Sequence, residues 1–393
     1  MNFALLGDDV DAVEFVAAVC RHPDHRLVLA CGAERLGESV RTLAPGCVCV
    51  GEWDSSAASG KIEALIVATG DERLLSVARD WAADGEPVVL VPDFDNHSAF
   101  VYELALKQED AGGLLFPAFP FAGSRLLRGL NDRLQQGTMG TVRQITLERS
   151  LVGHDGQLSE RDCDRQMIAD LDLLRRIGGR FDQVTAIQVG RVEDRLLQTT
   201  VTLAGMRTPD VLWNVRAATE PTGWNLTVTA ANGRARMSGD AGGPPNLLEV
   251  EGVESFRQTD ERSTGETMLD RFEAQLQHPG DSPDWQQLTG LFELVDATRR
   301  SLVRRRTIDL HHADYSERTI LKTQMTAIGC SVLMLTVLAL IVLMGIDSLF
   351  NVGPTFRLIA RIAVFAPLFV FLAMQLLMLV ARPSPDESDT ITE

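Results

Sequence analysis

Two long apolar runs near the C-terminal end of this 393-residue chain constrain its fold most strongly. The first run, 325–346, has no charged residue across 22 positions, and the second, 362–380, has none across 19. A helix rises 1.5 Å per residue, so the first run would be ~33 Å long, enough for the ~30 Å hydrocarbon core of a bilayer. Asn351, Gly353 and Pro354, between the runs, favour a turn. The runs predict a transmembrane hairpin. The alternative is that the runs form two buried helices of a soluble core, but such helices rarely have so many apolar residues on every face.

Basic residues flank the predicted hairpin unevenly. Five lie just outside it and two lie in its loop: Arg305, Arg306, Arg318, Lys322 and Arg382 against Arg357 and Arg361. Positive charge gathers on the cytoplasmic side of a membrane, so both ends are expected there. The first residues lack the basic region and apolar stretch of a signal peptide. We therefore expect an integral protein of the inner or plasma membrane, with the lipid bilayer as a partner and a cytoplasmic globular part.

Charge and cysteine content limit the chemistry. The formal net charge of −17 argues against a nucleic-acid partner, because such a protein needs a basic face to displace phosphate counterions. The six cysteines include no CxxC pair, so neither a zinc site nor a disulfide framework follows from them. We predict no metal site.

The first part of the chain, 1–122, alternates strands with helices. Such alternation is typical of a doubly wound α/β domain around a parallel sheet. The stretch 64–69, Ala-Leu-Ile-Val-Ala-Thr, is apolar throughout except at its end, as a strand buried on both faces would be. The expected strands are 2–6, 26–31, 47–50, 64–69 and 87–91, with helices at 10–21 and 74–83.

The second part, 123–315, has a different pattern, in which several strands follow one another with turns between them. This pattern predicts an α+β domain with a large, open, mostly antiparallel sheet. The expected strands are 141–149, 183–189, 197–204, 211–216, 224–230 and 235–238, with helices at 126–136, 161–177, 264–277 and 283–305. The tail, 383–393, is acidic and is predicted to be disordered.

The turn after the first strand partly matches a dinucleotide-binding loop, G-x-G-x-x-G/A. Gly7 occupies the first position and Ala12 the last, but Asp9 replaces the middle glycine. A carboxylate ~4 Å from a pyrophosphate would oppose binding by about 1 kcal/mol in water and about 4 at an effective dielectric near 20. The acid that should bind the ribose is also missing, since the second strand ends Ala-Cys-Gly-Ala at 30–33. The loop predicts a dinucleotide fold, and leaves open whether it binds NAD(P) or has a weakened or empty site.

Several local sequences resemble the Gfo/Idh/MocA family of sugar and inositol dehydrogenases over about residues 1–310. They occur in the family's order at 62–69, 136–142, 171–178 and 297–310. The resemblance implies a Rossmann-like domain that binds NAD(P), with Gly7, Asp9, Ala12 and Thr69 as candidate cofactor-binding residues. It also implies a homo-oligomer that pairs through the open sheet of the second domain.

The chain departs from that family at the residues the resemblance would make catalytic. Members have a Glu-Lys-Pro motif after the fifth strand, and here Pro92 stands at the lysine position. They also have a histidine three residues before an aspartate, and Asp172 matches the aspartate whereas Ala169 stands at the histidine position. Asp172 and His97 are therefore the remaining candidate catalytic residues.

Two functions stay open from the sequence. The first is a membrane-anchored binding or scaffolding pseudoenzyme with a small-molecule or protein partner. The second is an active NAD(P)-dependent sugar or polyol dehydrogenase that uses divergent residues. Loss of acid–base groups that normally accelerate such reactions ~10²–10⁴-fold favours the first.

Overall fold

The computed structural model describes most of residues 1–310 and a few residues beyond them. Within 1–310 it leaves out 59, 93–97, 153–157, 191–195, 207, 221, 253–254 and 279–283, and beyond 310 it describes 334–336, 338–341 and 364. The chain divides into two compact units, Met1–His312 and Ala313–Glu393. All elements described below belong to the first unit.

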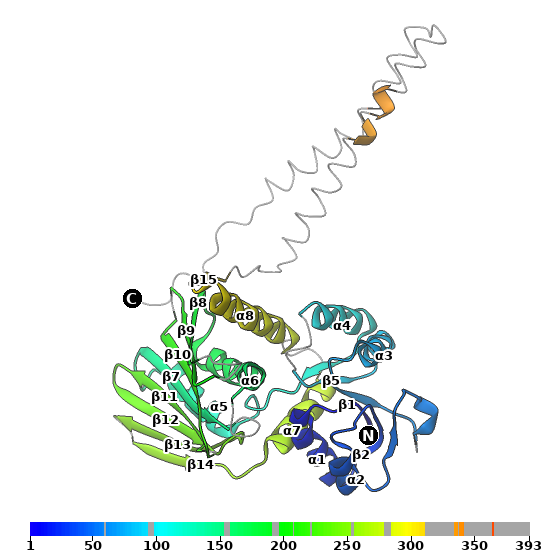
Figure 1. The fold of residues 1–393 in the computed structure, drawn as a ribbon, viewed down its shortest axis with the longest axis horizontal. Coiled ribbons are helices and arrows are strands. Elements are labelled where there is room, and N and C mark those ends of the chain that lie inside the picture. The colour runs from blue at the N-terminus through cyan, green and yellow to red at the C-terminus, as the bar shows by residue number, and fades with distance from the viewer. Residues whose placement is uncertain are drawn as a thin grey trace. The chain divides into compact units, whose positions relative to one another are not determined.

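A six-stranded parallel sheet forms the first half of this unit (Figure 1). The sequence predicts a parallel sheet and five of its strands, and the sixth, Leu115–Pro117, lies outside that prediction. The strand order is β3-β2-β1-β4-β5-β6, and β1 and β4 at its centre are almost wholly buried because nearly all their side chains are apolar. The strands are β1 (Asn2–Gly7), β2 (Arg26–Cys31), β3 (Val48–Val50), β4 (Ala64–Ala68), β5 (Val88–Leu90) and β6 (Leu115–Pro117). The segments between them form η1 (Val10–Ala12), α1 (Val13–Arg21), α2 (Gly37–Leu43), η2 (Ser55–Ala57), α3 (Glu72–Ala83) and α4 (Ser98–Ala111).

A nine-stranded mixed sheet forms the second half, in the order β14-β13-β12-β11-β7-β10-β9-β8-β15. β7 and β10 pair in parallel, and the other neighbouring strands pair antiparallel. The strands are β7 (Val142–Leu151), β8 (Gln183–Val189), β9 (Gln198–Ala204), β10 (Asp210–Ala217), β11 (Trp224–Ala230), β12 (Gly233–Gly239), β13 (Pro245–Gly252), β14 (Phe256–Thr259) and β15 (Ile308–Asp309).

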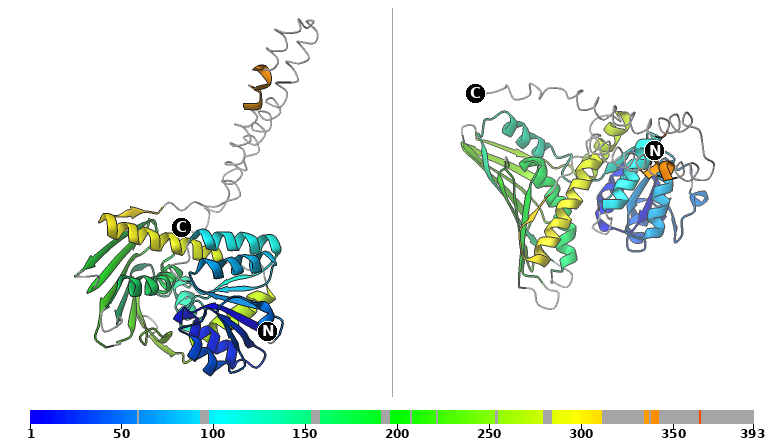
Figure 2. Two further views of the ribbon diagram at one scale, coloured as in Figure 1. Left: turned by 45° about the vertical axis from the view of Figure 1, so that its right-hand side comes forward. Right: turned by 90° about the horizontal axis from the view of Figure 1, so that it is seen from above.

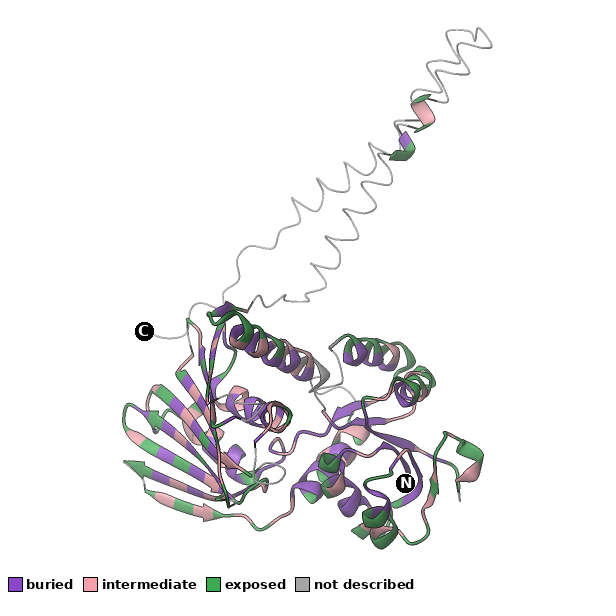
Figure 3. Cartoon of the chain, viewed as in Figure 1, coloured by how far each residue is buried: buried purple, intermediate pink, exposed green. Residues whose placement is uncertain are grey.

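Helices cover one face of the mixed sheet and leave the other open (Figures 1 and 2). They are α5 (Arg125–Gln135), α6 (Glu160–Gly178) and α8 (Asp284–Arg304). Buried residues alternate with exposed or intermediate ones along the strands, which Figure 3 shows as purple bands between green or pink ones. On β11 the buried set is Trp224, Leu226, Val228 and Ala230. This period of two explains why these strands could be predicted from the sequence.

One helix from late in the chain, α7 (Thr264–Gln277), packs against the first half of the unit. It lies beside α1 so closely that a Cβ atom on Gly265 would be 1.9 Å from the carbonyl oxygen of Glu14. Phe272 of α7 is fully buried, with ring centroids 5.8 Å from Phe3 and 5.6 Å from Phe116. Residues 264–277, which the sequence places in the second domain, therefore complete the hydrophobic core beneath the parallel sheet.

The predicted transmembrane runs, 325–346 and 362–380, lie almost wholly outside the described residues, as does the tail 383–393. Within the part of the chain that the structure describes, no helix is both long and apolar enough to cross a membrane.

Candidate functional site

The four candidate cofactor-binding residues lie together at the carboxyl ends of β1 and β4. Gly7 has a φ of 98°, and a Cβ atom there would be 2.3 Å from the carbonyl oxygen of Ala68 and 2.4 Å from Cβ of Thr69. Only glycine fits such a position. The Thr69 hydroxyl accepts a hydrogen bond from the Asp71 backbone N–H (3.0 Å) and so helps to fix the loop before α3. Ala12 is fully buried at the end of η1.

Asp9 caps the short helix that opens this loop. Its backbone N–H donates to the carbonyl oxygen of Ala68 (3.1 Å), and its carboxylate accepts from the backbone N–H of Asp11 (2.9 Å). The residue is 8% exposed, so the carboxylate is held inside the loop rather than in solvent. Backbone N–H groups at a helix start are the groups that bind phosphate in a dinucleotide fold. Here a carboxylate of the chain itself already occupies one of them.

Arg165 of α6 closes the loop from the second half of the unit. Its Nη2 lies 3.3 Å from Oδ2 of Asp9, and its Nε lies 3.6 Å from Oδ2 of Asp11. The Asp9 side chain is 6% exposed and that of Arg165 35%, so the pair is partly shielded from water. No local sequence pattern predicts this contact, because the partners are 156 residues apart.

The geometry of this loop can be compared with what a bound dinucleotide requires. A pyrophosphate needs free backbone N–H groups and an uncharged close approach. Asp9 accepts one such N–H and adds a negative charge, and its ion pair with Arg165 holds it in place. The residues present do not fit a pyrophosphate in this conformation.

Asp172, a candidate catalytic residue, lies on α6, which begins with a capping box formed by Ser159 and Asp162. Asp172 is 4% exposed, and its Oδ2 accepts a hydrogen bond from Nε of Arg176 (2.7 Å). Burial raises its pKa above the ordinary value, and the guanidinium groups of Arg176, Arg175 and Arg271 oppose the rise. A general base needs a lone pair directed at the substrate, whereas this carboxylate is directed at an arginine of its own helix.

The other catalytic positions add no acid or base. Ala169 lies on α6 one turn before Asp172, and Pro92 follows β5; both are partly buried. The other candidate catalytic residue, His97, lies outside the described residues.

Two further polar clusters could not be predicted from the sequence. In the first, Arg149 of β7 and Asp170 of α6 form a fully buried ion pair (2.8 Å), and the Trp213 indole N–H donates to the same carboxylate (2.9 Å). In the second, His22, His25 and Glu273 each place a metal-ligating atom within 4.8 Å of the others. There His25 Nε2 is 2.7 Å from the Glu273 carboxylate, a hydrogen-bond contact that joins α7 to the segment before β2.

Comparison with solved structures finds the same fold in several oxidoreductases. An oxidoreductase from Agrobacterium radiobacter, in complex with NAD+, L-tartaric acid and magnesium, matches at 17% identity and a TM-score of 0.64, over 79% of this chain and 98% of that one. A putative myo-inositol dehydrogenase from Sinorhizobium meliloti matches at 19% and 0.60, over 79% and 100%. A myo-inositol dehydrogenase from Corynebacterium glutamicum matches at 18% and 0.58, over 80% and 99%. No family model and no curated protein matches the sequence. These likenesses establish a parallel Rossmann-like sheet followed by a mixed sheet.

Proposed function

We propose that this chain is a Gfo/Idh/MocA-like protein, anchored in a membrane, in which a binding or scaffolding role has replaced dehydrogenase chemistry. The observation that supports this most is the ion pair between Arg165 and Asp9 (3.3 Å) across the cofactor loop. The fold that the chain shares with the solved oxidoreductases supports its origin among them.

The charge at the loop accounts for the loss of cofactor affinity. A dinucleotide would have to bring its pyrophosphate to the helix start that the Asp9 carboxylate caps. At ~4 Å and an effective dielectric near 20, the repulsion is about 4 kcal/mol, roughly a thousandfold in Kd. The ion pair with Arg165 must also break before Asp9 can move away.

The acid–base positions support the same conclusion. Oxidation of an alcohol by hydride transfer needs a base at the hydroxyl proton. Pro92 and Ala169 have no titratable group, and Asp172 is buried against Arg176. With Asp9 in the cofactor loop, Pro92 and Ala169 make three changes at separate places in the fold, as expected where selection no longer maintains hydride transfer.

The test is a titration of the purified full-length chain, kept in detergent, with NADH and NADPH. Binding is followed by isothermal calorimetry and by the fluorescence of the reduced nicotinamide. We expect no binding of either cofactor up to millimolar concentration. Binding in the micromolar range would contradict the proposal.

The second candidate is an active NAD(P)-dependent sugar or polyol dehydrogenase that uses Asp172 and His97. It is favoured by the structural neighbours solved with nicotinamide cofactors, one with NAD+ and another, a levoglucosan dehydrogenase, with NADH and L-sorbose. If this candidate is correct, the purified chain reduces NAD+ or NADP+ steadily when a polyol is supplied, and the Asp172→Asn variant does not. Absence of turnover across a panel of polyols and sugars, together with absence of cofactor binding, would exclude it.

The anchor is the C-terminal hairpin formed by 325–346 and 362–380, with the globular part on the cytoplasmic side of the inner or plasma membrane. Pairing of copies through the open face of the mixed sheet belongs to the same proposal. It is supported by exposed apolar side chains at that sheet, Ile187 (60%) and Val189 (54%) on β8. Chemical cross-linking of the full-length chain, compared with that of Ile187→Asp, tests the pairing: a covalent dimer should form and be lost in the variant.

A further inference from the structure

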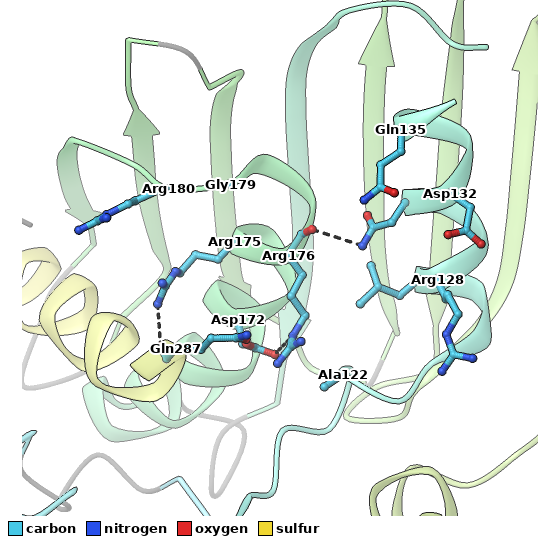
Figure 4. A pocket seen from close by; sticks show the side chains of 12 residues that line it. Ala122, Arg128, Asp132, Gln135, Asp172, Arg175, Arg176, Gly179, Arg180 and Gln287 are labelled. Atoms are coloured by element: carbon cyan, nitrogen blue, oxygen red, sulfur yellow. Dashed lines mark hydrogen bonds and ion pairs between the residues drawn. The ribbon is translucent and has the colours of Figure 1, made fainter. Parts of the chain in front are cut away.

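A cavity of about 470 Å³ lies where α5, the C-terminal end of α6 and the start of α8 meet (Figure 4). Four arginines line it, Arg128 from α5 and Arg175, Arg176 and Arg180 from the end of α6 and the residues after it. We call it the arginine cavity. Its two carboxylates, Asp132 and Asp172, offset only half of the arginine charge. In a chain with a net charge of −17, such a concentration of positive charge needs an explanation.

Two of the four guanidinium groups are held in place by their neighbours. Nη1 of Arg175 donates to the carbonyl oxygen of Gln287 (2.8 Å), and Nε of Arg176 donates to Asp172 (2.7 Å). The Asn131 amide donates to the carbonyl oxygen of Arg176 (3.3 Å) and so ties α5 to the end of α6. Binding groups fixed in this way lose little conformational freedom when a ligand arrives.

The cavity also contains a buried guanidinium nitrogen that has no hydrogen-bond acceptor in the described part of the chain. Nη2 of Arg176 is buried and has no hydrogen-bond partner among the residues that the structure describes. An orphaned buried donor is costly, and one on a charged group more so. Burial lowers the pKa of Arg175 from its ordinary value, and the charges of Arg176 and Arg180 lower it further. An anion in the cavity would accept a hydrogen bond from Nη2 of Arg176 and would offset the positive charge around Arg175.

We propose that the arginine cavity binds the phosphate group of a small phosphorylated sugar or polyol. Guanidinium groups form strong, directional hydrogen bonds with phosphate oxygens. The side chains of Asn131, Asp132 and Gln135, on the α5 wall, offer the donors and acceptors that sugar hydroxyls require. The volume lies within the range of small-molecule sites. The cavity is built by α5, α6 and α8, whereas the cofactor loop follows β1, so the two sites use different residues.

This inference gives a ligand to the proposed binding role. It is tested by calorimetric titration of the full-length chain in detergent with ribose 5-phosphate, and with ribose as the uncharged counterpart. We expect saturable binding of ribose 5-phosphate that weakens as salt is added, and no binding of ribose. Arg128→Gln and Arg175→Gln should each weaken binding roughly tenfold to a hundredfold, the range for one charge-assisted hydrogen bond.

The control is Arg143→Gln, which removes the same charge from an exposed position on β7 outside the cavity. The affinity of this variant for ribose 5-phosphate should equal that of the wild-type chain. Arg128 is exposed, so its replacement should leave the thermal unfolding temperature unchanged, and that measurement accompanies each titration. Absence of binding, or an equal loss in Arg143→Gln, would overturn the inference. Because NADH is a different probe, failure here is distinguishable from failure of the proposed function.

Discussion

At the scale of single residues, three aspartates of α6 each pair with a different arginine. Asp164 pairs with Arg299 of α8, Asp170 with Arg149 of β7 and Asp172 with Arg176, each at 2.7 or 2.8 Å. The sequence shows that Asp170 and Asp172, two residues apart, point in different directions, and that Asp164, eight residues before Asp172, lies roughly on the same face as Asp172. It does not show their partners, of which two come from other elements.

The buried pair between Asp170 and Arg149 should be the most costly of these to break. Asp170→Asn leaves the Arg149 charge buried and without a counter-charge, so we expect a loss of about 3–5 kcal/mol in the free energy of unfolding. The measurement is urea denaturation of the full-length chain. Asp296→Asn is the matched control, because its pair with Arg300 (3.1 Å) is exposed and should contribute less than about 1 kcal/mol. Equal losses in the two variants would contradict this assignment.

The cysteines should differ in their reaction with alkylating reagents. Burial raises the pKa of the Cys163 thiol to about 12, and Cys163 is 1% exposed. A thiol reacts as its thiolate, so raising the pH from 7 to 9 should leave Cys163 of the folded chain unmodified by iodoacetamide. Exposed Cys49 should react in this range, and mass spectrometry of peptides distinguishes the two. Modification of Cys163 before unfolding would contradict its burial.

At the scale of elements, the sequence predicted most of the two sheets and missed the pieces with weak patterns. β14 (Phe256–Thr259) has the sequence Phe-Arg-Gln-Thr and forms only because it pairs with β13 at the sheet edge. α4 (Ser98–Ala111) was missed because its apolar residues do not gather on one face. In the candidate site, Gly7, Asp9 and Thr69 could be predicted because each ends a strand or opens the turn after one. Arg165 could not, because its role depends on how two halves of the fold meet.

The capping box at the start of α6 should stabilise the helix that supplies Arg165 and Asp172. The Ser159 hydroxyl accepts from the backbone N–H of Asp162 (3.2 Å), and Asp162 accepts from the backbone N–H of Ser159 (3.0 Å). Ser159→Ala removes the first of these bonds and should lower the free energy of unfolding by about 1 kcal/mol. Ser159→Asp keeps an acceptor there and should remain close to the original chain. A loss of the same size in both variants would mean that capping is not the cause.

At the scale of the whole molecule, we propose that the chain combines an enzyme-like body with a membrane anchor. The body's fold is shared with solved oxidoreductases over about four fifths of the chain. The anchor is proposed from the apolar runs 325–346 and 362–380 alone. The proposed loss of cofactor binding and the proposed anchor together suit a body that captures a ligand or partner at a membrane.

Removal of residues 320–393 tests the anchor. The full-length chain should sediment with membranes and stay there after an alkaline wash, because two apolar helices partition into hydrocarbon. The shortened chain should be released into the soluble fraction. Release of the full-length chain by the alkaline wash would contradict a transmembrane hairpin.

The central claim is that Asp9, held by Arg165, occupies the place of a pyrophosphate. Its most direct test is the affinity for NADH of Asp9→Gly, which restores the middle glycine of the loop, compared with Asp8→Gly, which removes an equal charge one residue earlier. We expect NADH to bind Asp9→Gly roughly a thousandfold more tightly than the original chain, the factor for relief of about 4 kcal/mol of repulsion, and Asp8→Gly to show little change. If Asp9→Gly binds NADH no better than the original chain, the carboxylate is not what closes the site, and the account is wrong.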